Sequence, residues 1–294
     1  FLGRADVVHL VGVYSLITLL TLAYCKLRGK PVLRLPCGAL RYPKHGRNIL
    51  LKRIWLRLCD LLWPQGSTIH FTSDQEMASA KLRRGQGCVV VPHGVDCGED
   101  MVSGRLQSDL GRSLLYMGRL DPMKGVENLL HAMSADACLD WNLEICGDGA
   151  RAYVLQLRSL AARLGLENRV TFSGHVEARE KHAAFIRANV FVLPSYSESF
   201  GIAVVEALAH GVPVIASHGA PWAELEARGC GLWVNNDPGD LAAAIASIGN
   251  EDMHAMGQRG RDWMQQCYAW PDVAARMLVV YRDLMRHAGK RPPF

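Results

Sequence analysis

Two acidic residues eight positions apart lie in one segment, FVLPSYSESFGIAVVEALAHGVPVIAS, residues 191–217. This segment reads as an apolar strand, a polar loop that contains Glu198, and a helix that begins near Gly201 and contains Glu206. A helix N-terminus that follows a strand offers unpaired N–H groups and a positive dipole end to a phosphate. The spacing predicts a site for a phosphorylated ligand, with Glu198 facing sugar hydroxyls and Glu206 accepting the ribose hydroxyls.

The same segment also has a purely structural interpretation, a capped helix that carries exposed acids. However, Glu206 precedes Ala207 and Leu208 in an otherwise apolar helix, and a carboxylate among apolar neighbours needs a partner. Gly201 lacks a side chain where a ligand would have to approach the backbone. These two features favour the ligand site.

A second loop, YMGRLDPMKG at residues 116–125, carries two cations just beyond another predicted strand. Gly118 permits a sharp turn there, and Arg119 and Lys124 follow it. Taken alone, this segment is better explained by a surface loop with ordinary positive charges. Together with the acidic loop after a second strand, the two cations indicate neutralisation of a diphosphate.

A third loop, LEICGDGA at residues 143–150, predicts a tight turn from strand to helix at Gly147. It is not a GxGxxG motif, because Ala152 holds the last glycine position, so dinucleotide binding is only weakly supported. The sequence contains no HExxH, GxSxG or GxxxxGK[ST] motif.

Short apolar runs alternate with longer amphipathic stretches along most of the chain, which predicts an α/β protein with doubly wound parallel sheets. The predicted strands are residues 6–10, 31–35, 68–71, 88–91, 113–117, 142–146, 170–172, 190–193, 213–216 and 231–234. The predicted helices include residues 48–62, 73–82, 126–133, 151–164, 202–209 and a last one at 271–286. The final six strands form a complete Rossmann-like set, whereas the first four begin in the middle of such a unit.

Composition and charge add an expectation about location. Nine cysteines without a CxxC pair indicate reduced thiols in a cytoplasmic protein. Residues 1–110 carry fifteen Lys/Arg against eight Asp/Glu, and this excess would suit an anionic membrane or equally a solvated basic face. The basic residues concerned are Arg41, Lys44, Arg47, Lys52, Arg53 and Arg57. The chain shows no aromatic interleaving of the kind that nucleic-acid binding uses.

The apolar segment at residues 7–25 approaches the length of a membrane span. His9, Gly12, Ser15 and Thr18 interrupt it, so a strand followed by a buried helix is the preferred interpretation.

Several motifs together resemble the retaining glycosyltransferases of family GT4, which have the GT-B fold. ESFGIAVVE at 198–206 resembles the E-x7-E signature of that family. Further matches are GRLDPMKG (118–125), GDG (147–149), VTFSGHV (170–176), LPSYSESFG (193–201), EALAHGVPVIAS (206–217) and GLWVNNDPGDLAAAI (231–245). The resemblance implies two Rossmann-like domains that face a central cleft. The acceptor domain would comprise residues 1–109, incomplete at its N-terminus, with helix 271–287 packing back on it, and the donor domain residues 110–270.

The resemblance also implies roles for individual residues. Catalytic roles fall to Glu198, Arg119 and Lys124. Donor-binding roles fall to Gly118, Arg119, Lys124, Gly147, Ser199, Phe200, Gly201, Ile202 and Glu206, with Gly201 and Ile202 as backbone donors. Cations and a helix N-terminus would stabilise the diphosphate leaving group, so no metal or other cofactor is expected.

The sequence therefore predicts a retaining hexosyltransferase that moves a sugar from a nucleotide-diphosphate-sugar to a glycan or lipid-linked acceptor. We expect it to act in cell-surface polysaccharide or glycolipid synthesis, in the cytoplasm at the inner face of the plasma membrane, in peripheral contact with anionic lipid. Two alternatives stay open at this point. One is a nucleotide-sugar-binding module or inactive GT-B remnant, and the other is a sugar-nucleotide epimerase or phosphorylase on the same fold.

Overall fold

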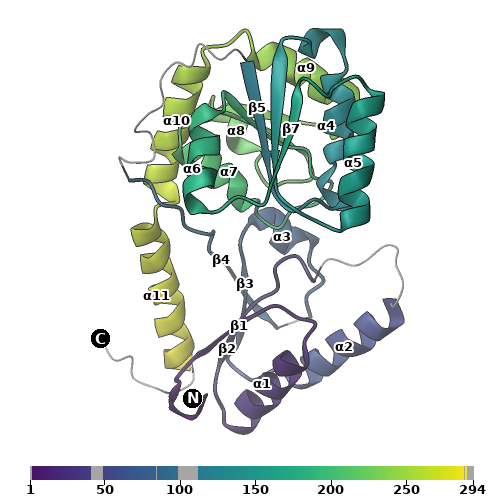
Figure 1. Cartoon of the computed structure of the whole chain (residues 1–294). Coiled ribbons are helices and arrows are strands. Elements are labelled where there is room, and N and C mark those ends of the chain that lie inside the picture. The colour runs from purple at the N-terminus through teal and green to yellow at the C-terminus, as the bar shows by residue number, and fades with distance from the viewer. Residues whose placement is uncertain (1, 41–48, 84, 99–111, 288, 290–294) are drawn as a thin grey trace. The chain divides into compact units, whose positions relative to one another are not determined.

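The computed structural model describes residues 2–40, 49–83, 85–98, 112–287 and 289. The chain divides into two compact units, Phe1–His93 with Pro271–Phe294, and Gly94–Trp270. Each unit contains one parallel β-sheet, of four strands in the first and six in the second (Figure 1). The predicted α/β class and the predicted division into four and six strands are both confirmed.

The first unit has its four strands in sequence order, β1-β2-β3-β4. The strands are β1 (Val8–Val11), β2 (Val32–Leu35), β3 (Thr68–Phe71) and β4 (Gly87–Val90). Its helices are α1 (Leu16–Leu27), α2 (Ile49–Leu61), α3 (Asp74–Ser79) and α11 (Trp270–His287). The first residue of α11, Trp270, belongs to the second unit, and the rest of the helix belongs to the first. Ser15 and Ser73 begin α1 and α3 by accepting a hydrogen bond from the backbone three residues later, as N-cap residues do.

The apolar segment at residues 7–25 forms strand β1 and helix α1. The helix is only half buried, because Thr18, Thr21, Leu22 and Cys25 face the core while Leu16, Ile17 and Leu20 are exposed. Among the described residues, no helix has both the length and the apolar character needed to cross a membrane.

The second unit has the strand order β10-β9-β8-β5-β6-β7, with every pair parallel. These strands are β5 (Arg112–Met117), β6 (Trp141–Cys146), β7 (Val170–Gly174), β8 (Val190–Leu193), β9 (Val214–Ser217) and β10 (Gly231–Val234). Read from the other edge, this is the doubly wound order of a Rossmann fold. The order reverses between β5 and β8, which are hydrogen-bonded neighbours.

Helices cover both faces of the six-stranded sheet (Figure 1). One face packs against α4 (Val126–Met133), α5 (Arg151–Arg163) and α9 (Pro238–Ile248), with Trp141 fully buried in that layer. The other face packs against α6 (Ala178–Arg187), α7 (Ile202–Ala209) and α10 (Met253–Cys267). Burial of both faces explains why the strands read as continuous apolar runs. A short helix, α8 (Glu224–Ala227), precedes β10.

One predicted helix is too long. The prediction of residues 73–82 exceeds the observed α3, which ends at Ser79. Ala80 is already extended, and the backbone N–H of Lys81 donates to Leu40 O at 3.4 Å. A backbone hydrogen bond to a distant loop therefore competes with continuation of the helix.

The predicted domain boundary between residues 109 and 110 lies outside the described residues and stays a prediction. Residues 94–98 belong to the second unit, although they were assigned to the first. Val95 N donates to Tyr268 O at 2.9 Å, and the Val95 side chain is buried in the second unit's core. A Cβ added to Gly94 would lie 2.4 Å from the Trp270 ring.

A chain of polar rings in the first unit provides a test of its packing. His9 Nδ1 lies 2.8 Å from Tyr281 OH, and His9 Nε2 lies 3.4 Å from His70 Nδ1. His70 Nε2 donates to Val91 O at 2.8 Å. Burial, assisted by the neighbouring His70, lowers the pKa of His9 from 6.5 to about 4. Burial also lowers the pKa of His70.

We predict that the free energy of unfolding falls as the pH drops from 7 towards 4. In this window the unfolded chain protonates His9 while the folded chain resists protonation, so acid favours unfolding. The expected loss through His9 is on the order of 1–2 kcal/mol, because one pKa unit is worth about 1.4 kcal/mol and His9 is only partly buried. Urea unfolding of wild type and His9→Gln at pH 7.5 and 5 measures it. An equal pH dependence in both proteins would contradict the prediction.

Candidate functional site

The predicted site residues lie on three neighbouring loops of the second unit, at the carboxyl ends of β5, β6 and β8, and, for Ile202 and Glu206, in the helix α7 that follows the third loop. Ligands of open α/β sheets bind outside the carboxyl ends of the strands, at the point where the strand order reverses. That point lies between β5 and β8, so the loops at residues 118–125 and 194–201 flank it.

The loop after β5 is held in a defined turn. Asp121 accepts a hydrogen bond from Met123 N at 3.0 Å and begins a 3₁₀ turn over Pro122–Lys124. Gly125 follows in the left-handed region, with φ 64°, and leads directly into α4. An N-cap aspartate with proline at the first position is a local sequence signal for such a turn.

A buried tyrosine forms a hydrogen bond to the backbone at the start of this loop. Tyr116 OH donates to Arg119 O at 3.0 Å. Burial, and then the negative charges of Glu198 and Asp121, raise the pKa of Tyr116. The hydroxyl therefore stays a protonated donor that fixes the backbone at Arg119.

The loop after β6 packs tightly against the loop after β5. Gly147 has φ 146°, and a Cβ placed on it would lie 1.8 Å from Gly118 O. Gly118 N donates to Cys146 O at 3.0 Å, and Leu120 N donates to Asp148 O at 2.8 Å. Gly147 and Gly118 are thus brought together, and the lack of a side chain at Gly147 is what lets the two loops approach.

The loop after β8 also touches the loop after β5. Tyr196 N donates to Met123 O at 2.9 Å. A Cβ on Gly125 would lie 2.1 Å from Pro194 O, so glycine is required by the contact as well as by its positive φ. This contact places Lys124 beside Glu198.

Lys124 and Glu198 form an ion pair with 2.5 Å between Nζ and Oε1. Only 19% and 12% of their side chains are exposed. Ser195 Oγ donates to the same carboxylate oxygen at 3.0 Å, and Glu198 N donates to Gly219 O at 2.9 Å. The acid and the cation that were predicted separately are therefore in direct contact.

The side chain of Arg119 does not take part in the contact between Lys124 and Glu198. Its side chain is exposed and makes no hydrogen bond or ion pair with another described residue. It lies five positions before Lys124 on the same loop, at the carboxyl end of β5.

Helix α7 begins at Ile202 with an open N-terminus. Gly201 precedes it with φ 85°, and no side chain of the described residues caps this end. Ile202 is 49% exposed and Ser199 is partly exposed. A Cβ on Gly201 would lie 3.1 Å from Leu193 Cδ2. Glycine is therefore also favoured at this position by close packing against Leu193, which the sequence did not indicate.

Phe200 is placed differently from a ligand-contacting side chain. It is 3% exposed, and its ring lies 5.3 Å from that of Trp222, between centroids. Trp222 Nε1 donates to Phe200 O at 2.6 Å. The side chain of Phe200 therefore anchors the loop in the core. The two residues that follow it, Gly201 and Ile202, form the N-terminus of α7.

Glu206 lies in α7 and has a partner that the sequence did not reveal. Lys181 of α6 places its Nζ 2.5 Å from Glu206 Oε1. Side-chain exposure is 34% for Lys181 and 21% for Glu206. The only signal in the sequence was the need of an acid among apolar residues for a partner, which did not say where the partner was. Ser195, three residues before Glu198, was also missed.

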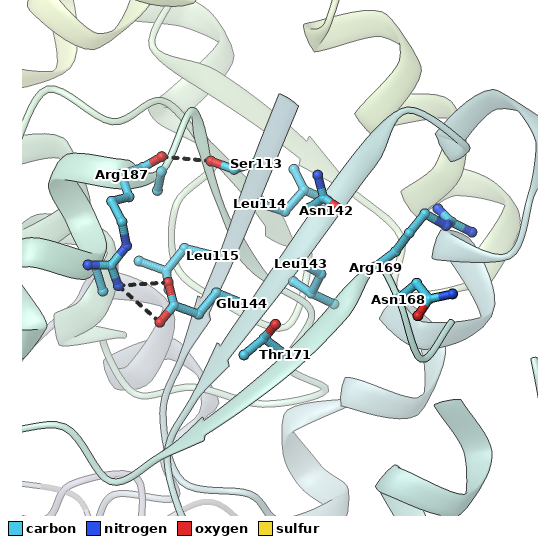
Figure 2. Close-up of a pocket in the computed structure, with 12 residues that line it drawn as sticks. Ser113, Leu114, Leu115, Asn142, Leu143, Glu144, Asn168, Arg169, Thr171 and Arg187 are labelled. Carbon is cyan, nitrogen blue, oxygen red and sulfur yellow. Dashed lines mark hydrogen bonds and ion pairs between the residues drawn. The ribbon is translucent and has the colours of Figure 1, made fainter. Parts of the chain in front are cut away.

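A separate pocket lies at the opposite ends of the strands. It has a volume of about 340 Å³ and is lined by residues that begin β5, β6 and β7, together with the end of α6 (Figure 2). Arg187 Nη2 lies 3.1 and 3.0 Å from the two carboxylate oxygens of Glu144 in this pocket. None of the predicted site residues lines it.

Within the described residues, no group of three or more His, Cys, Asp or Glu side chains is arranged to hold a metal ion. The prediction that no metal is needed is not tested by that finding and stays a prediction.

Comparison with known proteins agrees with the predicted family. The family model for glycosyl transferases group 1 matches residues 107–263. D-inositol 3-phosphate glycosyltransferase of Corynebacterium glutamicum is 33% identical over 202 residues, which is 63% of this chain and 48% of that protein. GDP-mannose:cellobiosyl-diphosphopolyprenol alpha-mannosyltransferase of Xanthomonas oryzae pv. oryzae is 28% identical over 96% of this chain and 75% of that protein. The chain spans about half the length of the corynebacterial relatives.

Solved structures show the same fold. Sucrose-phosphate synthase from Thermosynechococcus elongatus aligns with a TM-score of 0.78 and 25% identity over 96% of this chain and 74% of that chain. HepE from Anabaena, in complex with UDP and glucose, aligns with a TM-score of 0.77 and 19% identity over 94% of this chain and 77% of that chain. The chain therefore has the predicted GT-B fold and belongs to the glycosyl transferases group 1 family.

Proposed function

We propose that this chain is a hexosyltransferase that moves a sugar from a nucleotide-diphosphate-sugar to an acceptor hydroxyl. The observation that carries the proposal is the ion pair of Lys124 with Glu198, which lies four residues before the first residue of α7 and its open N-terminus. A cation and a helix end at the point of strand reversal make a site for a diphosphate.

The diphosphate has three sources of positive charge in this arrangement. The N–H groups at the start of α7 and its dipole face one phosphate. Lys124 exchanges Glu198 for a phosphate oxygen, and exposed Arg119 reaches the ligand from the same loop. Glu198 is then released to accept hydrogen bonds from the sugar hydroxyls.

The proposed reaction breaks the bond between the anomeric carbon and the diphosphate oxygen, and the electron pair leaves with the diphosphate. The acceptor oxygen forms the new bond on the same face of the sugar, so configuration is retained. Its proton passes to the departing phosphate oxygen, and no protein nucleophile is needed. Lys124, Arg119 and the α7 N-terminus stabilise the charge of the leaving group, which removes the need for a metal ion.

The relatives guide the proposal for donor and acceptor. One is named as a mannosyltransferase that uses GDP-mannose and a cellobiosyl-diphosphopolyprenol, and HepE was solved with UDP and glucose. A further fold neighbour, WaaG, is described as a glycosyltransferase of lipopolysaccharide biosynthesis. We therefore propose a glycan or lipid-linked acceptor and a role in cell-surface polysaccharide or glycolipid synthesis.

Helix α2 supports peripheral contact with a membrane at its cytoplasmic face. Five apolar side chains of this helix are 41–70% exposed and recur on one side of it: Leu50, Leu51, Ile54, Leu58 and Leu61. At 3.6 residues per turn, Arg53 and Arg57 lie along one edge of that apolar side. An apolar stripe beside arginines suits the surface of an anionic bilayer. Arg41, Lys44 and Arg47 lie outside the described residues.

Nucleotide binding tests the donor site. Calorimetric titration of the chain with UDP, GDP, ADP and CMP is expected to show saturable binding of one of them that EDTA does not abolish. Glu206→Ala should weaken that binding by roughly 1.5–3 kcal/mol, the value of a hydrogen bond to a charged group. The matched control is Glu167→Ala, since Glu167 is exposed on the same unit. Absence of binding to all four nucleotides would contradict the proposal.

Lys124 should recognise the second phosphate. We expect Lys124→Met to reduce the preference for the nucleoside diphosphate over the monophosphate by roughly 10–100-fold, because one charged hydrogen bond is lost. Removing Lys124 also leaves Glu198 unpaired, so the double variant Lys124→Met with Glu198→Gln serves as the control for stability. A double variant that is as stable as wild type yet keeps the full diphosphate preference would show that Lys124 does not bind the phosphate.

Vesicle sedimentation tests the membrane contact. The chain should pellet with vesicles that contain phosphatidylserine at low salt and remain in the supernatant with neutral vesicles. Arg53→Gln with Arg57→Gln should weaken binding by about 2 kcal/mol, close to 1 kcal/mol for each charge. Arg151→Gln with Arg179→Gln removes the same charge from exposed positions of the second unit and should have no effect. If wild type does not pellet with anionic vesicles at low salt, membrane contact is excluded.

A further inference from the structure

Helices α6 and α7 are joined by two polar contacts at one place. Lys181 of α6 pairs with Glu206 of α7, and the next residue, His182, places its Nδ1 3.1 Å from His210 Nε2. His210 Nδ1 in turn donates to the backbone oxygen of Glu206 at 2.6 Å. Both contacts converge on Glu206, the residue that the sequence predicts as the acceptor for the ribose hydroxyls.

The backbone that carries Lys181 is held firmly. A capping box of Glu177 and Glu180 begins α6, and Phe185 is fully buried in the core. The Phe185 ring stacks on the His210 ring with 4.6 Å between centroids. Lys181 therefore reaches Glu206 from a fixed position.

Lys181 and Glu206 can each form further hydrogen bonds beyond their ion pair. Glu206 Oε1 accepts from Lys181, whereas Oε2 has no hydrogen-bond donor among the described residues. The Lys181 ammonium has three N–H bonds and uses one of them here. Both groups are partly exposed, at 34% and 21%, so a ligand can reach them.

We propose that Lys181 is a positioning residue for ribose recognition, and this rests on the proposed function. It holds one oxygen of Glu206 so that the other faces the ribose hydroxyls in a single orientation. The ribose hydroxyls are the donors, and one carboxylate oxygen can accept from both of them if its lone pairs face them. A carboxylate free to rotate would present that oxygen correctly only part of the time. Lys181 thereby sets how strongly the site discriminates a ribonucleotide from its 2′-deoxy analogue.

The test compares binding of a ribonucleoside diphosphate, UDP or GDP as the titrations decide, with its 2′-deoxy form. Wild type should prefer the ribo form by roughly 10–100-fold, the value of a charged hydrogen bond. Lys181→Met should reduce this preference to about 3-fold or less, because the acceptor loses its orientation. Lys181→Arg should restore most of it, since the guanidinium keeps both charge and donors.

Controls separate positioning from general damage. Arg179→Met removes an exposed cation from the same helix and should leave the preference unchanged. If Lys181→Met does not fold, as judged by thermal unfolding, Lys181→Gln replaces it. Glu206→Gln should lower the preference in the same way, and combining it with Lys181→Met should add little, because the two residues act through one contact.

The outcomes distinguish this inference from the function on which it rests. If Glu206→Gln lowers the preference and the folded Lys181 variants keep it, the role of Lys181 is overturned and the donor site stands. If wild type binds no nucleotide at all, the proposed function itself fails and the inference falls with it.

Discussion

The hydrogen-bonded pairing of β5 with β8 is the constraint on which the site depends. These two strands are not consecutive in the chain, and their pairing is where the strand order of the sheet reverses. It brings the loops that follow them into backbone contact, with Tyr196 N donating to Met123 O and Gly125 against Pro194 O. The position of Lys124, the ion pair with Glu198 and the start of α7 at Ile202 all follow from that contact. A side chain at Gly125 would force these two loops apart.

Charge balance is the second organising feature of the site. Each of the two acids eight positions apart already has a lysine at 2.5 Å, Lys124 for Glu198 and Lys181 for Glu206. Both pairs are largely but not fully buried, which keeps the charges out of bulk water and still within reach of a ligand. In the proposed reaction the two pairs behave differently. Lys124 leaves Glu198 and binds the diphosphate, whereas Lys181 stays paired with Glu206 and orients its carboxylate.

The sequence was sufficient for most of the fold. Strands buried on both faces read as short apolar runs, so Val190–Leu193 and Gly231–Val234 were predicted with their observed bounds. Helix α3 was predicted three residues too long, because its end depends on a hydrogen bond to Leu40, which no local pattern reveals. The half-exposed character of α1 was missed for the same reason, since exposure depends on what packs against the helix.

The site was predictable where its residues lie close together in the sequence. The loop at 118–125 carries glycines and two cations, the loop at 194–201 carries a glycine and an acid, and their meeting follows from a doubly wound sheet. Lys181 was not predictable, because it lies 25 positions before Glu206 on another helix whose pattern is that of an ordinary amphipathic segment. The core position of the Phe200 side chain was likewise hidden, since it depends on Trp222 and Tyr268, which are distant in the sequence.

A crystal structure of this chain with its bound nucleoside diphosphate would test the proposed donor site most directly. We expect the second phosphate within about 3 Å of the backbone N–H of Ile202 and of Lys124 Nζ, the length of a charge-assisted hydrogen bond. In that state Lys124 should have moved away from Glu198. A diphosphate bound elsewhere, for example in the pocket at the amino ends of the strands, with the Lys124–Glu198 pair intact, would contradict the account.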